Sequence, residues 1–258
     1  MDFQLELTKS NRLKLANAFR RNKHVDFAID CAVEGQMGLA FVDDPSQPTA
    51  FRITVGPFWY FAGNASLPAA RQMMHRLPAY AILMPSATGW FELARDIFGP
   101  DLKPFARYSF SPANLSSRHL ESLLSQSPHR ERLTPIRAKL ATQLASQPDS
   151  YFDLSDFDSI QDFTERSLAF ALVDGNTVQG VAYSSLVCSR GIEVSIFVEE
   201  PYRQQGVATA LASQLLLECL KQGLQPNWDA ANPESSKLAQ KLGFEFVEAY
   251  EAFYHTRK

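Results

Sequence analysis

The most informative part of the sequence is VEEPYRQQGVAT, residues Val198–Thr209. It joins a run of alternating apolar residues to a run with helical spacing, which is typical of a strand, a turn and the start of a long helix. Backbone N–H groups at a helix start have no intrahelical partner, and the helix dipole is positive there. Gly206 lets the backbone come close to an anion, and the small Ala208 leaves room beside it. The stretch predicts a cradle for a pyrophosphate; the alternative interpretation is a solvated helix start.

The residues around this stretch predict a sheet flanked by helices. Before it, the strand Ile192–Val198 alternates, so that Glu193 and Phe197 share the face opposite the aliphatic side chains. After it, the apolar spacing predicts a helix over Val207–Gln222 that a glycine ends. The other elements expected in this half are a hairpin of Leu168–Val173 and Val178–Val187 around Asp174-Gly175-Asn176, a strand over Gln225–Ala230, a helix from Asn232-Pro233-Glu234 to Gly243, and a strand over Phe244–Tyr254. This order predicts an α/β (α+β) fold with a mixed, mostly antiparallel central sheet.

The distribution of proline and serine divides the chain into two parts. Twelve of the 15 prolines lie between Pro45 and Pro148, and the segment Ser111–Arg130 has the serine- and proline-rich composition of a connector. A short helix over Arg118–Leu124 is compatible with that segment. We therefore expect a smaller α/β domain over residues 1–115, a connector over 116–130 and a second domain over 131–258. In the first domain we expect helices over Ser10–Arg21, Pro68–Leu77 and Gly89–Ile97, and strands over Val25–Val33, Gly38–Val42, Ala50–Val55, Phe58–Ala62 and Ala79–Met84.

Composition excludes several classes of protein. With 25 Lys and Arg against 28 Asp and Glu, the net charge is −3, so neither nucleic acid nor an anionic membrane is the expected partner. No apolar run approaches the roughly 18 residues of a membrane span, and the N-terminus has no signal-peptide pattern, so we expect a cytoplasmic protein. The three cysteines (Cys31, Cys188 and Cys219) and the five histidines have neither disulfide-framework nor metal-ligand spacing. We therefore expect no metal.

Two motifs together resemble those of the GNAT (GCN5-related N-acetyltransferase) superfamily. The acetyl-CoA motif of that superfamily, Gln/Arg-x-x-Gly-x-Gly/Ala between a strand and a helix, is matched by Arg203, Gly206 and Ala208. A second signature, Asn-x-x-(Ala/Ser)-x-x-Leu-x-x-x-x-Gly-Phe, is matched by Asn232, Ser235, Leu238, Gly243 and Phe244. Nearly the whole chain is similar to a subgroup of two-part bacterial GNAT acetyltransferases, in the phrases EGQMGLAFVDDPSQP, FWYFAGN, RYSF and GLQPNWDAAN.

The resemblance implies an N-acetyltransferase that moves an acetyl group from acetyl-CoA to a primary amine of a small molecule or peptide. The pyrophosphate would lie at the helix start, the pantetheine arm between two splayed strands, and a strand amide would polarise the thioester carbonyl. The residues expected to contact acetyl-CoA are Phe197, Val198, Arg203, Gln204, Gln205, Gly206, Val207, Ala208, Thr209, Asn232 and Ser235. The resemblance is also compatible with a homodimer. It is compatible as well with a first domain that is a degenerate GNAT-like half and lines the acceptor side of the cleft.

The sequence departs from the family at one catalytic position. Many GNAT enzymes carry a tyrosine there that protonates the leaving thiolate, whereas this chain has Ala239. Another group or water would then supply the proton; Tyr183, Tyr250 and Tyr254 are candidates, each with packing in a sheet as the alternative. The departure motivates a second hypothesis, a non-catalytic protein that binds or senses acyl-CoA.

Two carboxylates are candidates for the general base. Glu193 lies on the strand that precedes the motif, where partial burial would raise its pKa, and its alternative role is a solvated glutamate. Asp229 is the second candidate, with a structural role in the turn before Asn232 as its alternative. Glu193 and Asp229 are thus the expected catalytic residues.

Overall fold

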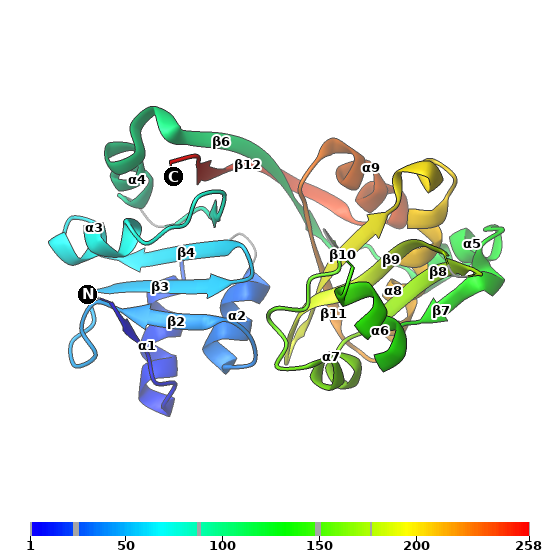
Figure 1. The fold of residues 1–258 in the computed structure, drawn as a ribbon, viewed down its shortest axis with the longest axis horizontal. Helices are drawn as coiled ribbons and strands as arrows, with labels where there is room; N and C mark the ends of the chain where they lie inside the picture. Colours follow the sequence, from blue (N-terminus) through cyan, green and yellow to red (C-terminus); the bar gives the residue numbers. More distant parts are fainter. Residues whose placement is uncertain (1, 23–25, 87–88, 148–150, 176, 258) are drawn as a thin grey trace. The chain divides into compact units, whose positions relative to one another are not determined.

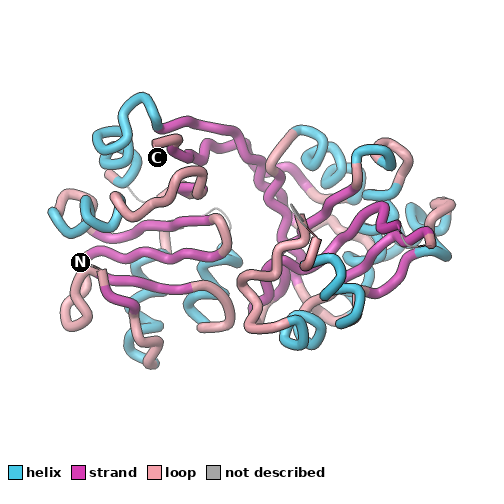
Figure 2. The backbone as a smooth tube through the Cα atoms, in the orientation of Figure 1, coloured by secondary structure: helices cyan, strands magenta, loops and turns pink. Residues whose placement is uncertain are grey.

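The computed structural model describes residues 2–22, 26–86, 89–147, 151–175 and 177–257, which form two compact units (Figure 1). One unit comprises Met1–Arg107 and Ala249–Lys258, and the other comprises Tyr108–Glu248. Strands β6 (Leu102–Ser111) and β12 (Glu245–His255) each run from one unit into the other. In both units the strands lie side by side with helices along them (Figure 2).

The unit boundaries differ from the domain limits expected from composition. The segment expected as a connector, residues 116–130, contains helix α5 (Ser117–Ser125), which belongs to the second unit. Its residues Leu120 and Leu124 are buried, and α5 packs on the long helix of that unit. Three of the six serines that suggested a linker, Ser117, Ser122 and Ser125, are exposed on this amphipathic helix. The C-terminal strand returns to the first unit because its last residues pair there, as in Phe253 opposite Leu83 of β5.

The first unit contains a sheet in the order β1-β2-β3-β4-β5-β12, antiparallel except for the parallel pair β4 and β5. Its further elements are β1 (Phe3–Gln4), α1 (Lys9–Phe19), α2 (Asp26–Glu34), β2 (Leu39–Val42), β3 (Ala50–Val55), β4 (Phe58–Gly63), α3 (Pro68–Met74), β5 (Ile82–Leu83), α4 (Trp90–Phe98) and the 3₁₀ turn η1 (Gly99–Asp101). Its core includes Phe61, Met73, Leu83 and Trp90, all fully buried.

One strand expected in the first unit is a helix. The run Val25–Val33 was expected to be extended, but its described part forms α2. Phe27, Ala28, Cys31 and Ala32 are buried, which is helical spacing. A short continuous apolar run does not distinguish a buried strand from a buried helix, and that ambiguity explains the error. Of the expected strand Ala79–Met84, only the two residues of β5 are extended and paired.

The second unit has strands in the order β6-β11-β10-β9-β8-β7. Its further elements are η2 (Arg130–Arg132), β7 (Leu133–Pro135), α6 (Ala138–Ala145), α7 (Ile160–Arg166), β8 (Ala169–Asp174), β9 (Thr177–Cys188), β10 (Gly191–Val198), η3 (Glu200–Tyr202), α8 (Val207–Lys221), β11 (Gln225–Ala230) and α9 (Pro233–Leu242). Strands β10 and β11 pair in parallel. The pairs β6–β11, β10–β9, β9–β8 and β8–β7 are antiparallel. The mixed, mostly antiparallel sheet expected from the sequence is confirmed.

The two faces of β10 have different neighbours, as its alternation predicted. Val194 and Ile196 pack on the core that includes Ala212 and Leu216 of α8. On the opposite face Phe197 stacks on Tyr151, and the Ser195 side chain hydrogen-bonds with Tyr183 of β9. Helix α8 therefore covers one face of the sheet, and the segment that leads into α7 covers the other. Among the described helices, none has the length and apolar character needed to cross a membrane.

Candidate active site

The expected pyrophosphate cradle lies where β10 gives way to α8. Gly206 is the N-cap residue of α8, with a left-handed φ of 84°, and Gln204 also has a positive φ, 60°. The first helical hydrogen bond is donated by the Ala210 N–H to the Gly206 carbonyl, at 3.0 Å. The N–H groups of Val207, Ala208 and Thr209 thus precede the intrahelical ladder. A Cβ added to Gly206 would meet no atom within 4 Å, so the space outside this turn is open.

Side chains of the turn hold its shape. The Arg203 Nε donates to the Val198 carbonyl at 3.0 Å, and the Gln205 Nε2 donates to the Pro201 carbonyl at 2.8 Å. Gln204, Gln205 and Gly206 are exposed, whereas Val207 is buried beneath the turn. Arg203 therefore helps to shape the turn, while residues 204–206 are exposed.

Two residues that the sequence did not single out also contact this turn. The Lys241 Nζ lies 3.2 Å from the Thr209 Oγ1 and donates to it. The His129 Nε2 lies 2.9 Å from the Gln205 carbonyl oxygen, to which it donates when it carries the ring proton. Lys241 lies in the last turn of α9, where lysine is common because its charge complements the helix dipole. Its sequence position therefore did not predict the contact with Thr209.

The parallel strands β10 and β11 are paired over only part of their length. Their register runs from Gly191 opposite Gln225 to Glu193 opposite Asn227. Beyond that point, Trp228–Ala230 of β11 pair with β6, whereas Val194–Val198 of β10 continue on β9. The pairing of β10 with β11 therefore ends before Phe197 and Val198, two of the residues expected to contact acetyl-CoA, while each strand keeps its other neighbour.

Glu193 and Asp229, the two expected catalytic carboxylates, lie on these neighbouring strands. Glu193 is 9% exposed, and its Oε2 accepts a hydrogen bond from the Asn227 Nδ2 at 2.6 Å. Asn227 and Asp229 are two residues apart on β11 and so point to the same face of the sheet. Asp229 is half-buried and pairs with Ser109 of β6. Asn227 thus connects the first candidate base to the strand that carries the second.

The start of α9 is closed by its own chain. The Asn232 Oδ1 accepts from the Ser235 N–H at 2.8 Å, as expected for an N-cap residue. The Ser235 Oγ accepts from the Trp228 Nε1 at 3.2 Å. Both residues were expected to touch acetyl-CoA, and the structure gives each a contact within the protein.

Ala239 and the three candidate tyrosines differ in their surroundings. Ala239 is fully buried in the core of the second unit. The Tyr183 hydroxyl donates to the Tyr151 carbonyl at 3.2 Å and accepts from the Asp153 N–H at 3.3 Å, and burial raises the pKa of Tyr183. Tyr250 and Tyr254 belong to the first unit.

The cysteine of α8 is a core residue. Cys219 is buried, and burial raises the pKa of its thiol to about 12. Among the described residues, no group of three or more His, Cys, Asp and Glu side chains is arranged to hold a metal ion.

The fold and this strand–turn–helix junction define a class of enzyme. The sequence matches the family described as GNAT acetyltransferase over residues 19–253, so the chain belongs to this family and is an acetyltransferase. The resemblance inferred from the two motifs is thereby confirmed.

Individual relatives agree with this assignment. The chain is 24% identical over 259 residues to the uncharacterized N-acetyltransferase YdfB of Bacillus subtilis (strain 168), covering 96% of this chain and 97% of that protein. The crystal structure of a GCN5-related N-acetyltransferase-like protein from Streptococcus suis superposes with a TM-score of 0.82 at 28% identity, covering 95% of this chain and 98% of that one. A GNAT-family acetyltransferase from Colwellia psychrerythraea shares the fold, with a TM-score of 0.57 at 12% identity over 100% of both chains.

Proposed function

We propose that the protein transfers an acetyl group from acetyl-CoA to a primary amine of a small molecule or peptide, by direct attack of the amine on the thioester. The observation that carries the proposal is the start of α8, which leaves the N–H groups of residues 207–209 ahead of the helical ladder beside an open glycine turn. Backbone donors and a positive helix dipole at one point suit a pyrophosphate.

The residues present fit the donor along its length. The turn Gln204–Thr209 would hold the pyrophosphate, with the Lys241 ammonium beside Thr209 adding a positive charge. The part of β10 beyond Glu193, which is no longer paired with β11, offers a strand edge to the amide groups of the pantetheine arm. The donor itself supplies an activated acetyl group whose carbonyl carbon is open to a nucleophile.

The chain's own groups then act on the amine. The nitrogen forms a bond to the acetyl carbon, the carbon–sulfur bond breaks, and the nitrogen loses a proton. Glu193 is the proposed acceptor of that proton, directly or through water, because its carboxylate lies on the strand that carries Phe197 and Val198. Asp229 is the second candidate. The departing sulfur takes up a proton from water or from a group other than residue 239.

Thermal unfolding with and without acetyl-CoA tests the donor site. At about 100 times its dissociation constant a ligand adds roughly 2.7 kcal/mol to the free energy of unfolding, which raises the melting temperature by about 5–10 °C. We expect this shift in the wild type and its loss in Gly206→Glu, which places a carboxylate in the turn. The matched control is Gly223→Glu, because Gly223 has a similar φ of 72° and equally open surroundings beyond the other end of α8.

The control separates strain from ligand binding. A shift that survives in Gly206→Glu, or that is lost equally in Gly223→Glu, would contradict a pyrophosphate site at this turn.

Ala239 favours one alternative, a non-catalytic protein that binds acyl-CoA, because its methyl group cannot protonate a thiolate. Release of free CoA thiol from acetyl-CoA in the presence of an amine panel distinguishes the two functions. The acetyltransferase proposal predicts amine-dependent thiol release that falls strongly in Glu193→Gln, while acetyl-CoA binding persists. Binding without release for any amine would favour the alternative.

A further inference from the structure

One tyrosine of the second unit is held in an exposed position against the proposed thioester site. Tyr151 is 69% exposed, yet its ring stacks on Phe197 with centroids 4.2 Å apart and planes inclined by 18°. Phe197 covers one face of the tyrosine ring, and the exposure of the residue leaves the other face to solvent. The pair therefore presents one aromatic face to solvent on the strand where we place the thioester.

The segment that carries Tyr151 is anchored on the sheet. The buried Tyr183 hydroxyl bonds both the Tyr151 carbonyl and the Asp153 N–H. Between them, Phe152 is 4% exposed and packs against Tyr183 and Phe163, with ring centroids 4.7 Å and 5.3 Å away. The residue that bears the exposed ring is therefore held through its own carbonyl and through the two residues that follow it, so a ligand that binds the ring meets a preorganised surface.

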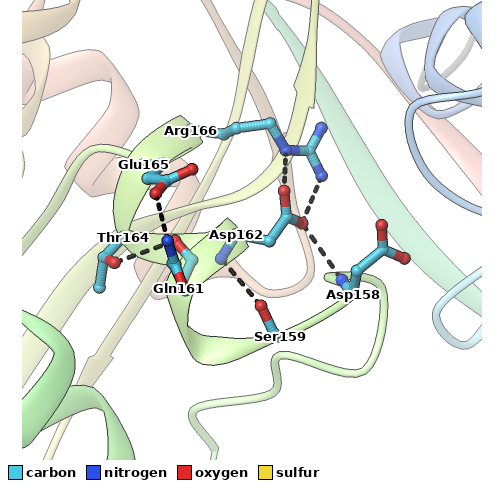
Figure 3. A network of polar contacts seen from close by, with 7 residues as sticks. All are labelled: Asp158, Ser159, Gln161, Asp162, Thr164, Glu165 and Arg166. Carbon is cyan, nitrogen blue, oxygen red and sulfur yellow. Dashed lines mark hydrogen bonds and ion pairs between the residues drawn. The ribbon is translucent and has the colours of Figure 1, made fainter.

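The same segment is strongly acidic. Residues 151–166 contain five carboxylates, Asp153, Asp156, Asp158, Asp162 and Glu165, against the single cation Arg166. Arg166 is committed to Asp162, with its Nε and Nη2 at 2.7 and 2.9 Å from the carboxylate oxygens (Figure 3). The segment that carries Tyr151 thus has an excess of negative charge, which favours a cation over a neutral ligand.

We propose that Tyr151, backed by Phe197, is the platform that binds a cationic group of the acceptor, so that preferred acceptors carry a fixed positive charge in addition to the reacting amine. A cation lies favourably over the face of an aromatic ring, and the acidic segment strengthens the attraction. This inference rests on the proposed function, since it is the backbone of Phe197 that we place beside the thioester. Tyr151 is a binding residue and takes no part in proton transfer.

The test uses two probes that differ only in charge. Choline and its neutral isostere 3,3-dimethylbutan-1-ol are titrated by calorimetry into the full-length protein saturated with CoA. We expect choline to bind at least about fivefold more tightly than the alcohol, the lower range of a partly desolvated cation–π contact. Tyr151→Phe should keep this preference, and both Tyr151→Ala and Tyr151→Leu should abolish it, since leucine keeps apolar bulk without the ring.

A matched control is available in the first unit. Tyr80 is 65% exposed and stacks on Tyr254 with centroids 5.9 Å apart, so Tyr80→Ala removes a comparable ring elsewhere and should leave the choline preference unchanged. Equal affinity for the two probes in the wild type, or a preference that survives both Tyr151→Ala and Tyr151→Leu, overturns the inference.

A separate acetyl-CoA titration distinguishes failure of the aromatic platform from failure of the proposed function. If acetyl-CoA binds but choline shows no preference, the aromatic platform is wrong and the proposed function stands. If acetyl-CoA does not bind, the proposed function fails and the assignment of Tyr151 to an acceptor fails with it.

Discussion

Helices α8 and α9 begin in opposite ways, although each follows one of two parallel strands. At α9 the Asn232 side chain caps the helix, Pro233 occupies the first turn, and Glu234 places a negative charge there. At α8, within residues 177–257, which the structure describes without a gap, no side chain caps the helix and no acidic residue lies in the first turn. One helix satisfies its positive end from its own sequence, whereas the other has no such cap at the end where we propose that the pyrophosphate binds.

The largest effect is expected from a negative charge in the first turn of α8, such as Glu234 provides in α9. Thr209→Glu places a carboxylate in the first turn of α8, next to Lys241. We expect the ligand-free protein to gain about 0.3–1 kcal/mol, because the charge complements the helix dipole. We expect acetyl-CoA to bind at least about tenfold more weakly, ~1.4 kcal/mol, because the carboxylate repels the pyrophosphate.

Melting temperature without ligand and calorimetric titration of acetyl-CoA measure the two effects of Thr209→Glu. The isosteric control Thr209→Val removes the hydroxyl without adding charge and should leave the ligand-free stability nearly unchanged. Unaltered acetyl-CoA affinity in Thr209→Glu would show that the start of α8 is not the anion site.

The converse change removes the cap of α9. Asn232→Ala leaves the Ser235 N–H without its acceptor at 2.8 Å, and we expect a loss of about 1 kcal/mol in the free energy of unfolding. Chemical denaturation of the ligand-free protein measures it. Asn232→Ser, which retains an acceptor oxygen, should recover most of the loss, and equal destabilisation by both variants would argue against a capping role.

A smaller effect is expected from the lysine that α9 contributes to the start of α8. Lys241→Ala should weaken acetyl-CoA binding by about threefold, because an exposed charge-assisted contact contributes much less binding free energy than a buried one. The effect should shrink as salt is raised. Lys237→Ala, one turn earlier on the same exposed side of the chain, is the control. Equal effects of the two substitutions would point to general attraction and not to a contact at Thr209.

Much of this contrast could be predicted from sequence because it is local. The start of α9 follows from three adjacent residues, Asn232-Pro233-Glu234, and the start of α8 from the glycine turn before an apolar helix. The contacts of His129 with Gln205 and of Lys241 with Thr209 could not be predicted, because they join residues 76 and 32 positions apart. Tertiary packing creates such pairs, and no local pattern encodes them.

The same limit explains why the sequence predicted a strand in place of α2 and why it did not single out Tyr151. The apolar run that became α2 has a composition suited to either element, and only its neighbours decide between them. Tyr151 carries no motif either; its role as a platform depends on Phe197, which β10 brings beside it from 46 positions further along the sequence. The glycine turn at one helix start was predictable, whereas contacts between residues from several elements were not.

The smallest effect concerns a third helix start, that of α7, which resembles α9. Its N-cap Ser159 accepts from the Asp162 N–H at 3.0 Å, and the hydrogen bonds from Arg166 to the Asp162 carboxylate lower the pKa of that group (Figure 3). A carboxyl with a lowered folded-state pKa stabilises the protein above its unfolded-state pKa, and the contribution is lost as pH falls through the folded-state pKa. Asp162→Asn should therefore cost about 0.3–0.5 kcal/mol at pH 7, as for an exposed i,i+4 pair.

Urea denaturation at pH 7 and again below pH 4 checks this sign. The difference between wild type and Asp162→Asn should be present at pH 7 and shrink toward zero in acid, because the wild-type carboxyl is then neutral as well. Asp158→Asn is the control, since only the backbone N–H of Asp158 donates to Asp162, at 3.1 Å. A difference that persists unchanged in acid would mean that the side chain of Asp162 stabilises α7 by packing and not by its charge.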